Sequence, residues 1–303
     1  MSKPCQDTGS QFIHHSTLHN PPHTLSLTTK PSQNITFIIR EILQETTNRS
    51  PQMKTVKVRN LTIGEGMPKI CVPIVENTEE NILTEAEKIK TLPADIVEWR
   101  MDWYAQATDE QAVVKTAEKL RNILGEMPLL ATFRTAKEGG EKEILKADYE
   151  KLNLAVINSG YADLIDVEAF IGEDTVKRLI VAAHQAGVKV VASNHDFTKT
   201  PPKEEIIKRL RQMQSYDADI PKIAVMPEKK ADVLSLLEAT TEMHEQYADR
   251  PIITMSMSHD GMISRICGEL TGSALTFGAA GKTSAPGQLD VHELKQILSV
   301  LHR

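Results

Sequence analysis

A lysine inside an apolar stretch is the residue of this sequence with the clearest chemical potential. Lys222 lies in the run 220–227, Ile-Pro-Lys-Ile-Ala-Val-Met-Pro, which is short enough to be one buried strand. Desolvation of an ammonium is costly, so such a site favours the neutral amine, and a neutral amine is a nucleophile. Lys222 is therefore a candidate for imine formation with a carbonyl substrate. The commoner alternative is a lysine with a buried stem whose charge reaches solvent or a carboxylate.

Charged and polar side chains also stand near the ends of other apolar runs, often two residues apart, which places them on one face of a strand. Taken singly, each has an ordinary explanation, such as an ion pair, a satisfied buried histidine or a methionine in the core. Together they are expected to converge, because a purely structural core would desolvate these charges without gain. The set, with two methionines, is Glu98, Arg100, Arg134, Asp166, Glu168, His195, Asp196, Arg265, Met255 and Met257.

These residue types suit imine chemistry on a small anionic ketone. A protonated imine is an electron sink that acidifies the neighbouring C–H, and a histidine can take that proton and return it to a leaving hydroxyl. A carboxylate such as Glu138 or Glu168 can orient the imidazole. Arginines can bind a substrate carboxylate through paired hydrogen bonds. The set therefore predicts elimination or carbon–carbon cleavage.

The elements that must position these residues form a regular alternation after Met53. Apolar runs rich in β-branched residues predict strands at 69–75, 96–102, 128–134, 163–169, 189–196, 220–227, 251–258 and 275–281. Helical patterns occupy 79–90, 109–124, 146–159, 173–186, 203–216, 229–247, 264–271 and 292–302. Eight such units in about 250 residues predict an α/β fold, the (β/α)8 or TIM barrel. A doubly wound sheet is the alternative, but the turn after 69–75 lacks its usual glycine-rich sequence.

Two further segments are expected to lie at the ends of the barrel. Residues 55–63 alternate in polarity and end at Gly-Glu-Gly, which predicts an N-terminal β-hairpin covering one end. Residues 278–288 are expected to form a mobile loop over the mouth, where Ser284 and Gln288 contact a ligand. Gly-Lys-Thr at 281–283 resembles the end of a phosphate-binding loop, but position 276 is threonine where that motif needs glycine.

Composition limits the class of protein. The chain has 303 residues, of which 40% are hydrophobic and 25% charged, as in ordinary globular proteins. The net charge of −6 argues against nucleic acid or an anionic membrane as a partner. No run approaches the roughly 18 apolar residues of a membrane span. Three scattered cysteines without metal-ligand spacing indicate a reducing, cytoplasmic compartment.

Residues 1–52 differ from the rest in composition. They are rich in Ser, Thr and Pro, have helical periodicity only near 35–46, and lack the pattern of a secretory signal. We expect an extension that is largely disordered or results from a misassigned start, followed by a catalytic domain at 53–303. Scattered histidines in a polar tail usually bind no metal. The histidines of this segment are His14, His15, His19 and His23.

Five motifs, in this order, closely resemble the type I 3-dehydroquinate dehydratase family. They are Glu-Trp-Arg-Met-Asp at 98–102, Thr-Phe-Arg-Thr-Ala-Lys-Glu-Gly-Gly at 132–140, Ser-Asn-His-Asp-Phe at 193–197, Pro-Lys-Ile-Ala at 221–224 and Ser-Ala-Pro-Gly-Gln at 284–288. The resemblance runs from Met53 to the C-terminus. It implies a homodimeric (β/α)8 hydro-lyase without cofactor or metal. Such an enzyme dehydrates 3-dehydroquinate to 3-dehydroshikimate by syn elimination, the third step of the shikimate route to chorismate and aromatic amino acids.

The resemblance also implies roles for individual residues. Lys222 would form the imine, while His195 would remove the C2 proton and protonate the departing hydroxyl, paired with Glu138. Arg265 would anchor the substrate carboxylate. The ring hydroxyls would meet Glu98, Arg100 and Arg134, Ser284 and Gln288 would close from the loop, and Met255 and Met257 would form apolar walls. Pro73 departs from the family pattern, because close relatives carry a serine there and proline has no side-chain donor.

Two other functions remain open on the sequence. A class I aldolase also uses a lysine imine on a barrel, but it would generally need a sugar-phosphate site, and no clear phosphate loop is present. A catalytically inactive binding protein on the same scaffold would be expected to lose the nucleophile or the base. Lys222 and His195 are both retained with their motifs.

Overall fold

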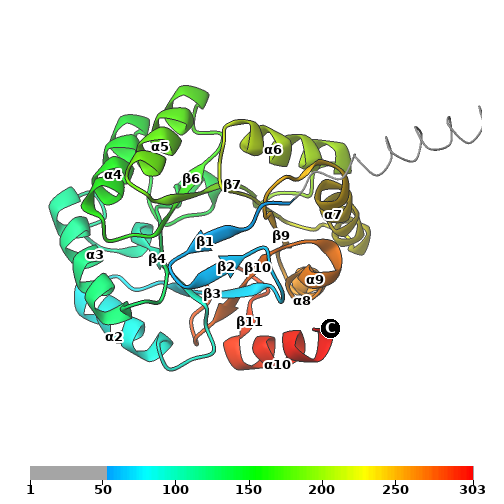
Figure 1. The fold of residues 1–303 in the computed structure, drawn as a ribbon, viewed down its shortest axis with the longest axis horizontal. Helices are drawn as coiled ribbons and strands as arrows, with labels where there is room; N and C mark the ends of the chain where they lie inside the picture. Colours follow the sequence, from blue (N-terminus) through cyan, green and yellow to red (C-terminus); the bar gives the residue numbers. More distant parts are fainter. Residues whose placement is uncertain (1–52, 303) are drawn as a thin grey trace, which may run out of the picture. The chain divides into compact units, whose positions relative to one another are not determined.

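Eight parallel strands and the helices that follow them make up the structure, a computed structural model that describes residues 53–302 (Figure 1). The extension predicted at 1–52, its short helix and its histidines lie outside the described residues. The barrel strands are β3 (Lys69–Ile74), β4 (Ile96–Arg100), β5 (Leu129–Thr132), β6 (Leu164–Glu168), β7 (Lys189–Asp196), β8 (Ile220–Val225), β9 (Ile253–Ser256) and β10 (Leu275–Ala279). They pair in chain order, and β11 (Leu289–Asp290) adds to β10. This confirms the predicted (β/α)8 barrel.

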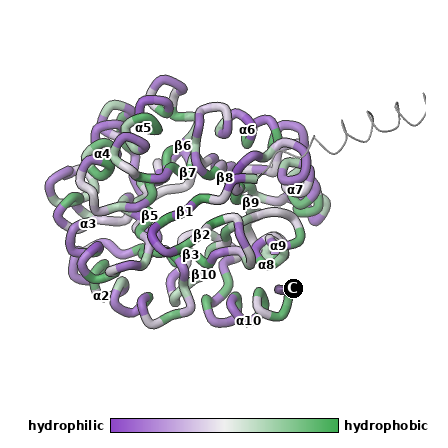
Figure 2. Tube along the Cα trace, in the orientation of Figure 1, coloured by the Kyte–Doolittle hydropathy of each residue, from purple (hydrophilic) through white to green (hydrophobic). Residues whose placement is uncertain are grey.

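Amphipathic helices cover the outside of this ring. Hydrophobic and hydrophilic residues alternate along them, with the hydrophobic positions turned towards the strands (Figure 2). No helix in residues 53–302 is long and apolar enough to cross a membrane. The helices are α2 (Glu79–Ile89), α3 (Glu110–Leu124), α4 (Lys146–Ser159), α5 (Glu173–Gln185), α6 (Lys203–Ser215), α7 (Lys230–Glu242), α8 (Ile263–Ile266), α9 (Gly268–Thr271) and α10 (Val291–Leu301), with single turns η1 (Met101–Trp103), η2 (Ala136–Glu138), η3 (Met243–Tyr247) and η4 (Asp260–Met262).

The ring closes between β9 and β10 with few backbone contacts. An isolated bridge joins Ile252 to Ser273, and Ala274 N–H donates to the carbonyl of Ile252 at 2.9 Å. The hydroxyl of Ser273 accepts from Thr254 N–H at 3.0 Å and lies 3.3 Å from the Thr254 carbonyl. A serine side chain therefore supplements the ladder at this seam.

Several strands end earlier than the apolar runs predict. The run 96–102 is a strand only to Arg100, and the run 128–134 only to Thr132. Past these points backbone N–H groups bond to buried carboxylates instead of to the next strand. Arg134 N donates to Asp102 Oδ1 at 3.3 Å and Thr135 N to Glu168 Oε1 at 2.8 Å. The strands therefore end where side-chain carboxylates replace the neighbouring strand as hydrogen-bond acceptors.

Two predicted helices are interrupted. The helix expected at 264–271 is split at Cys267 into α8 and α9. A Cβ at Gly268 would lie 2.6 Å from the Ser273 carbonyl oxygen, so the chain turns here to pass close to that backbone. The helix expected at 229–247 ends at Glu242 and continues as the π-helical turn η3.

The predicted hairpin is present and covers the amino ends of the barrel strands. Strand β1 (Val56–Val58) pairs antiparallel with β2 (Leu61–Ile63). Val56, Val58 and Ile63 are buried in one apolar cluster, whereas Lys57 is exposed. The cluster also contains residues from the first half of the barrel strands, namely Cys71, Ile96, Leu130, Leu164, Val191 and Ile220. The hairpin therefore closes this end and leaves the carboxyl ends for a site.

Truncation of the hairpin's buried face should affect stability without affecting the site. Ile63 is fully buried, so Ile63→Ala is expected to lower the free energy of unfolding by about 3 kcal/mol through lost burial and a residual cavity. Urea denaturation measures this change. Lys57→Ala, on the exposed face of the same hairpin, is the matched control and should change stability by less than about 0.5 kcal/mol. Equal losses in the two variants would contradict the proposed packing.

Candidate active site

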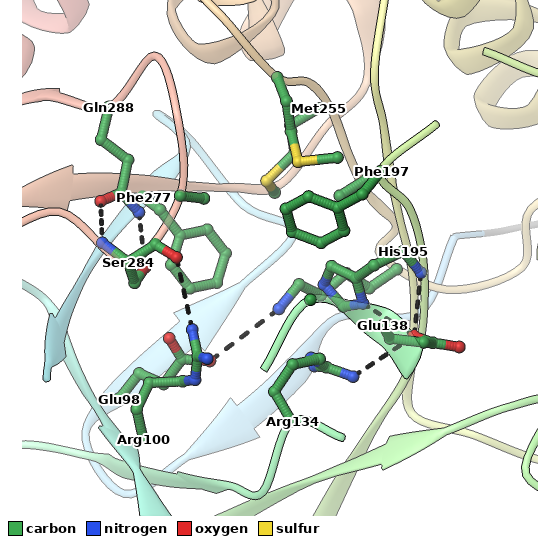
Figure 3. Close-up of a pocket in the computed structure, with 15 residues that line it drawn as sticks. Glu98, Arg100, Arg134, Glu138, His195, Phe197, Met255, Phe277, Ser284 and Gln288 are labelled. Carbon is green, nitrogen blue, oxygen red and sulfur yellow. Dashed lines mark hydrogen bonds and ion pairs between the residues drawn. The ribbon is translucent and has the colours of Figure 1, made fainter. Parts of the chain in front are cut away.

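A pocket with an empty volume of about 450 Å³ lies at the carboxyl ends of the strands (Figure 3). This is the end where enzymes of this architecture place their catalytic residues. Of the residues to which the family resemblance gives a role, every one except Arg265 lines it, whereas Asp166, Glu168 and Asp196 of the predicted set do not. The lining residues are Glu98, Arg100, Arg134, Glu138, Gly139, His195, Phe197, Lys222, Ala224, Met255, Met257, Phe277, Ser284, Ala285 and Gln288.

Lys222 is buried on β8 with its amine facing charged groups and an aromatic ring. Its Nζ lies 3.5 Å from Asp166 Oδ2 and 4.0 Å from Glu98 Oε1. The amine also lies 4.5 Å from the centroid of the Phe277 ring. These surroundings differ from the apolar ones that the sequence argument assumed, because an ammonium has two counter-charges here. Only a neutral amine is a nucleophile, and these two carboxylates stabilise any positive charge that the nitrogen carries.

His195, near the end of β7, is held by Glu138, which also lines the pocket. Its Nδ1 lies 3.0 Å from Glu138 Oε2, and its backbone N–H donates to the same oxygen at 3.0 Å. Glu138 ends the turn η2, and Gly139 follows in the left-handed conformation at φ +81°. Because Nδ1 faces the carboxylate, Nε2 is the ring nitrogen left for chemistry.

Burial shifts both members of this pair towards their neutral forms. Burial lowers the pKa of His195 well below its ordinary value, and the nearby cations Arg134, Lys222 and Arg100 add to that effect. Burial raises the pKa of Glu138 to about 8, against the opposing effect of Arg134. Since the two groups share a hydrogen bond, they titrate as a pair. The imidazole is therefore neutral near pH 7.

Arg134 lies among three carboxylates, two from strand β6 and one from the turn η2. Its guanidinium donates to Asp166 Oδ1 at 2.7 Å and to Glu168 Oε1 at 3.0 Å, and lies 3.5 Å from Glu138 Oε2. Burial alone would lower the pKa of Arg134, but these carboxylates together raise it above its ordinary value. Ser193 bridges the arginine and Asp166 with its hydroxyl, at 3.0 Å and 2.6 Å. The guanidinium is thus a fixed charge at the floor of the pocket.

Arg100 and the loop residues Ser284 and Gln288 form the opposite wall (Figure 3). Arg100 makes a two-pronged ion pair with Asp102, at 2.8 and 2.6 Å, and its Nη1 lies 3.5 Å from the Ser284 carbonyl. Ser284 N–H donates to Gln288 Oε1 at 2.9 Å, and Gln288 Nε2 donates to the Ser284 hydroxyl at 2.9 Å. The loop is therefore closed on itself and touches an arginine of the pocket.

Arg265 stands behind the pocket wall on α8. It is almost fully buried, donates to the Pro286 carbonyl at 3.0 Å and lies 3.7 Å from Met255 Sδ. Its Nε has no hydrogen-bond partner, and within residues 53–302 no carboxylate pairs with it. Burial lowers its pKa to about 10. The site therefore contains a desolvated guanidinium with spare donors, beside the loop.

Asp166, predicted among the converging charged groups, stands next to Lys222. Two aromatic residues of the site, Phe197 and Phe277, were absent from the predicted set. Phe197 belongs to the motif at 193–197, from which the predicted set includes only His195 and Asp196. Phe277 lies under the lysine and carries no titratable group, so its sequence context gives no signal. Pro73 pairs with Glu98 in the sheet and does not line the pocket.

Phe197 packs so closely against the loop that carries Glu138 that we expect position 139 to require glycine. A Cβ at this position would overlap the Phe197 ring, so Gly139→Ala should lower the free energy of unfolding by about 3 kcal/mol. Gly160→Ala is the matched control, because Gly160 has a similar φ of +73° and open space around it. It should lose only about 1 kcal/mol in urea denaturation. Similar losses in both would mean that backbone strain alone explains the glycine.

The fold and pocket define a (β/α)8 protein with a cluster of buried charges around a lysine and a histidine. Residues 70–303 match the model of the type I 3-dehydroquinase family. The chain is 56% identical over 250 residues to the 3-dehydroquinate dehydratase of Bacillus licheniformis, covering 82% of this chain and 98% of that protein. It is 54% identical over 251 residues to that of Salmonella typhimurium, covering 83% and 100%. The chain belongs to the type I 3-dehydroquinase family, as its motifs predict.

Solved structures agree with this assignment. The type I 3-dehydroquinate dehydratase of Clostridium difficile, solved with covalently modified comenic acid, superposes with a TM-score of 0.81 and 52% identity over 82% of this chain and 98% of that one. The 3-dehydroquinate dehydratase of Enterococcus faecalis gives 0.78 and 48%, over 82% and 100%. Both support the barrel fold at high identity.

Proposed function

We propose that this chain dehydrates 3-dehydroquinate to 3-dehydroshikimate by syn elimination through an imine on Lys222. The observation that carries the proposal is the meeting of a buried lysine amine and a glutamate-bound histidine in one pocket, in a chain of this family. The reaction is the third step of the shikimate route. We further propose a catalytic domain at 53–303, a homodimer and a cytoplasmic location.

The first stage joins the substrate to the lysine. The neutral amine of Lys222 attacks the ketone carbon, and loss of water from the resulting carbinolamine gives a protonated imine. Asp166 and Glu98, within 4.0 Å of the nitrogen, stabilise the positive charge of that iminium. His195 Nε2 delivers and receives the protons of this addition and of the later hydrolysis.

The second stage is the elimination. The iminium withdraws electrons and acidifies the adjacent C2–H, which neutral His195 removes at Nε2, leaving an enamine. The enamine electrons return and expel the hydroxyl, which takes the same proton from His195 and leaves as water. Glu138 accepts the Nδ1–H throughout and stabilises the transient imidazolium. Hydrolysis of the imine then frees the product and Lys222.

Substrate binding is assigned to the charged walls. Arg265 would take the substrate carboxylate, since it is a buried guanidinium with spare donors and no carboxylate partner among the described residues. Glu98, Arg100 and Arg134 would meet the ring hydroxyls, although two donors of Arg134 are already held by carboxylates. Met255 and Met257 would cover the apolar edge, and Ser284 and Gln288 would close from the loop.

Borohydride reduction during turnover should trap the imine on Lys222. Reduction converts it to a stable secondary amine, so the digested protein should carry the added mass on the peptide that contains this residue. Lys222→Ala should give no adduct and no turnover. The control is Lys189→Ala, which removes a lysine at the amino end of β7 and should retain both the adduct on Lys222 and turnover. An adduct at another residue, or turnover without any adduct, would overturn the mechanism.

The rate should depend on the ionisation of the pair formed by Glu138 and His195. The ionised carboxylate accepts the Nδ1–H more strongly than the protonated one does and stabilises the imidazolium that forms, and burial raises the pKa of Glu138 to about 8. We therefore expect kcat/KM to rise with pH through this region. Glu138→Gln should lose this rise and lower kcat by about 10- to 100-fold. Persistence of the same rise in Glu138→Gln would assign it to another group.

A further inference from the structure

A chain of hydrogen bonds runs from helix α6 to the proposed base. Arg209 Nη1, on α6, donates to Asn194 Oδ1 at 3.0 Å. Asn194 Nδ2 donates to Glu138 Oε1 at 3.2 Å, and Glu138 Oε2 lies 3.0 Å from His195 Nδ1. Neither Asn194 nor Arg209 lines the pocket. The chain therefore reaches the base from outside the barrel.

The position of Asn194 in β7 explains how it can do this. Ser193 and His195 are directed inward, where they meet Asp166 and the pocket, so the residue between them is directed outward. Asn194 is nevertheless buried, because α6 and the loop that carries Glu138 cover it. It is thus placed between the carboxylate and the helix.

The orientation of the Asn194 amide is dictated by Arg209. A guanidinium is only a donor, so the amide oxygen must face it, and the amide NH2 must then face Glu138. Arg209 is itself held by Glu205, whose Oε1 accepts from its Nε at 2.9 Å, and by the Phe170 ring at 5.9 Å. Without the arginine the amide could turn and present its oxygen to the carboxylate.

We propose that Asn194 and Arg209 are positioning residues, which fix the carboxylate of Glu138 so that its second oxygen holds His195 for proton transfer. The inference rests on the proposed function, in which Glu138 supports His195. Each oxygen of Glu138 then has its own donor: Asn194 on Oε1, and the backbone N–H of His195 on Oε2. The carboxylate is held at both atoms, and rotation away from the imidazole breaks one of these bonds.

The same contact favours the ionised carboxylate. The Asn194 donor lowers the pKa of Glu138 and so opposes the effect of burial. Loss of the donor should therefore raise that pKa and move the rise of the rate to higher pH. The charged and titratable groups around the pair are Arg134 on the β5 end, Asp166 and Glu168 on β6, Lys222 on β8, Arg100 on β4 and Arg209 on α6.

The first test is Asn194→Leu, which keeps the size and removes the donor. We expect kcat to fall about tenfold, with KM within about twofold, because one hydrogen bond to a charged group is lost. The rise of kcat/KM with pH should also move upward by at least half a pH unit. A fall in kcat with an unmoved pH profile would overturn the inference, since a purely structural loss gives that result.

The second test uses the surface end of the chain, where folding is not at risk. Arg209→Met should lower kcat about threefold and shift the pH profile in the same direction, whereas Arg209→Lys should restore most of the rate because it keeps a donor. Arg211→Met is the matched control on the same helix, since Arg211 lies against the Tyr247 ring at 4.7 Å. Equal effects of Arg209→Met and Arg211→Met would overturn the inference.

The third test separates this inference from the proposed function. If Asn194 acts through the carboxylate, then Asn194→Leu in a Glu138→Gln background should lower kcat by less than about threefold further. A full tenfold additional loss would mean that Asn194 acts independently. If Glu138→Gln alone keeps the wild-type kcat, the role of Glu138 in the proposed function is refuted. If Glu138→Gln lowers kcat but Asn194→Leu does not, only the present inference is refuted.

Discussion

The rest of the site depends on the mutual neutralisation of charges that the barrel has removed from water. Arg134 pairs with Asp166 and Glu168 and lies near Glu138, while Lys222 lies beside Asp166. A single buried ion of this kind would be strongly unfavourable, and only a network with saturated hydrogen bonds removes most of that penalty. A substitution that deletes one member removes a counter-charge from its neighbours, so the effects of such changes on stability and on binding are coupled.

The parallel register of the strands brings these charges together. Thr132 is opposite Asp166, Glu168 is opposite Ser193, and Ser193 is opposite Lys222. Residues that are opposite one another in adjacent parallel strands lie at one height, so these side chains form a layer just beneath the pocket. Glu138 and Arg265 come instead from turns beyond the strands, on η2 and α8, and complete the site from above.

Much of this arrangement could be predicted, because hydrophobic periodicity and strand number are local properties of the sequence. The boundaries of β7 and α4 agree with the predicted 189–196 and 146–159. Strand ends were overestimated where buried carboxylates bind the backbone, as at Arg134, since polarity alone does not show which partner an N–H finds. The surroundings of Lys222 were misjudged for a related reason. Apolar neighbours in one strand say nothing about carboxylates that arrive from strands β4 and β6.

The seam between β9 and β10 has a consequence for how ligand binding and folding are linked. With one backbone bridge and one serine, it has the fewest ladder hydrogen bonds of the barrel's strand junctions within residues 53–302. Arg265 follows the strand on one side of it, and the loop of Ser284 follows the strand on the other. A ligand bound by both Arg265 and this loop would link the two sides of the junction that has the fewest backbone hydrogen bonds. Occupancy would then suppress local opening of the barrel, and hydrogen exchange at Thr254 and Ala274 would slow with ligand concentration.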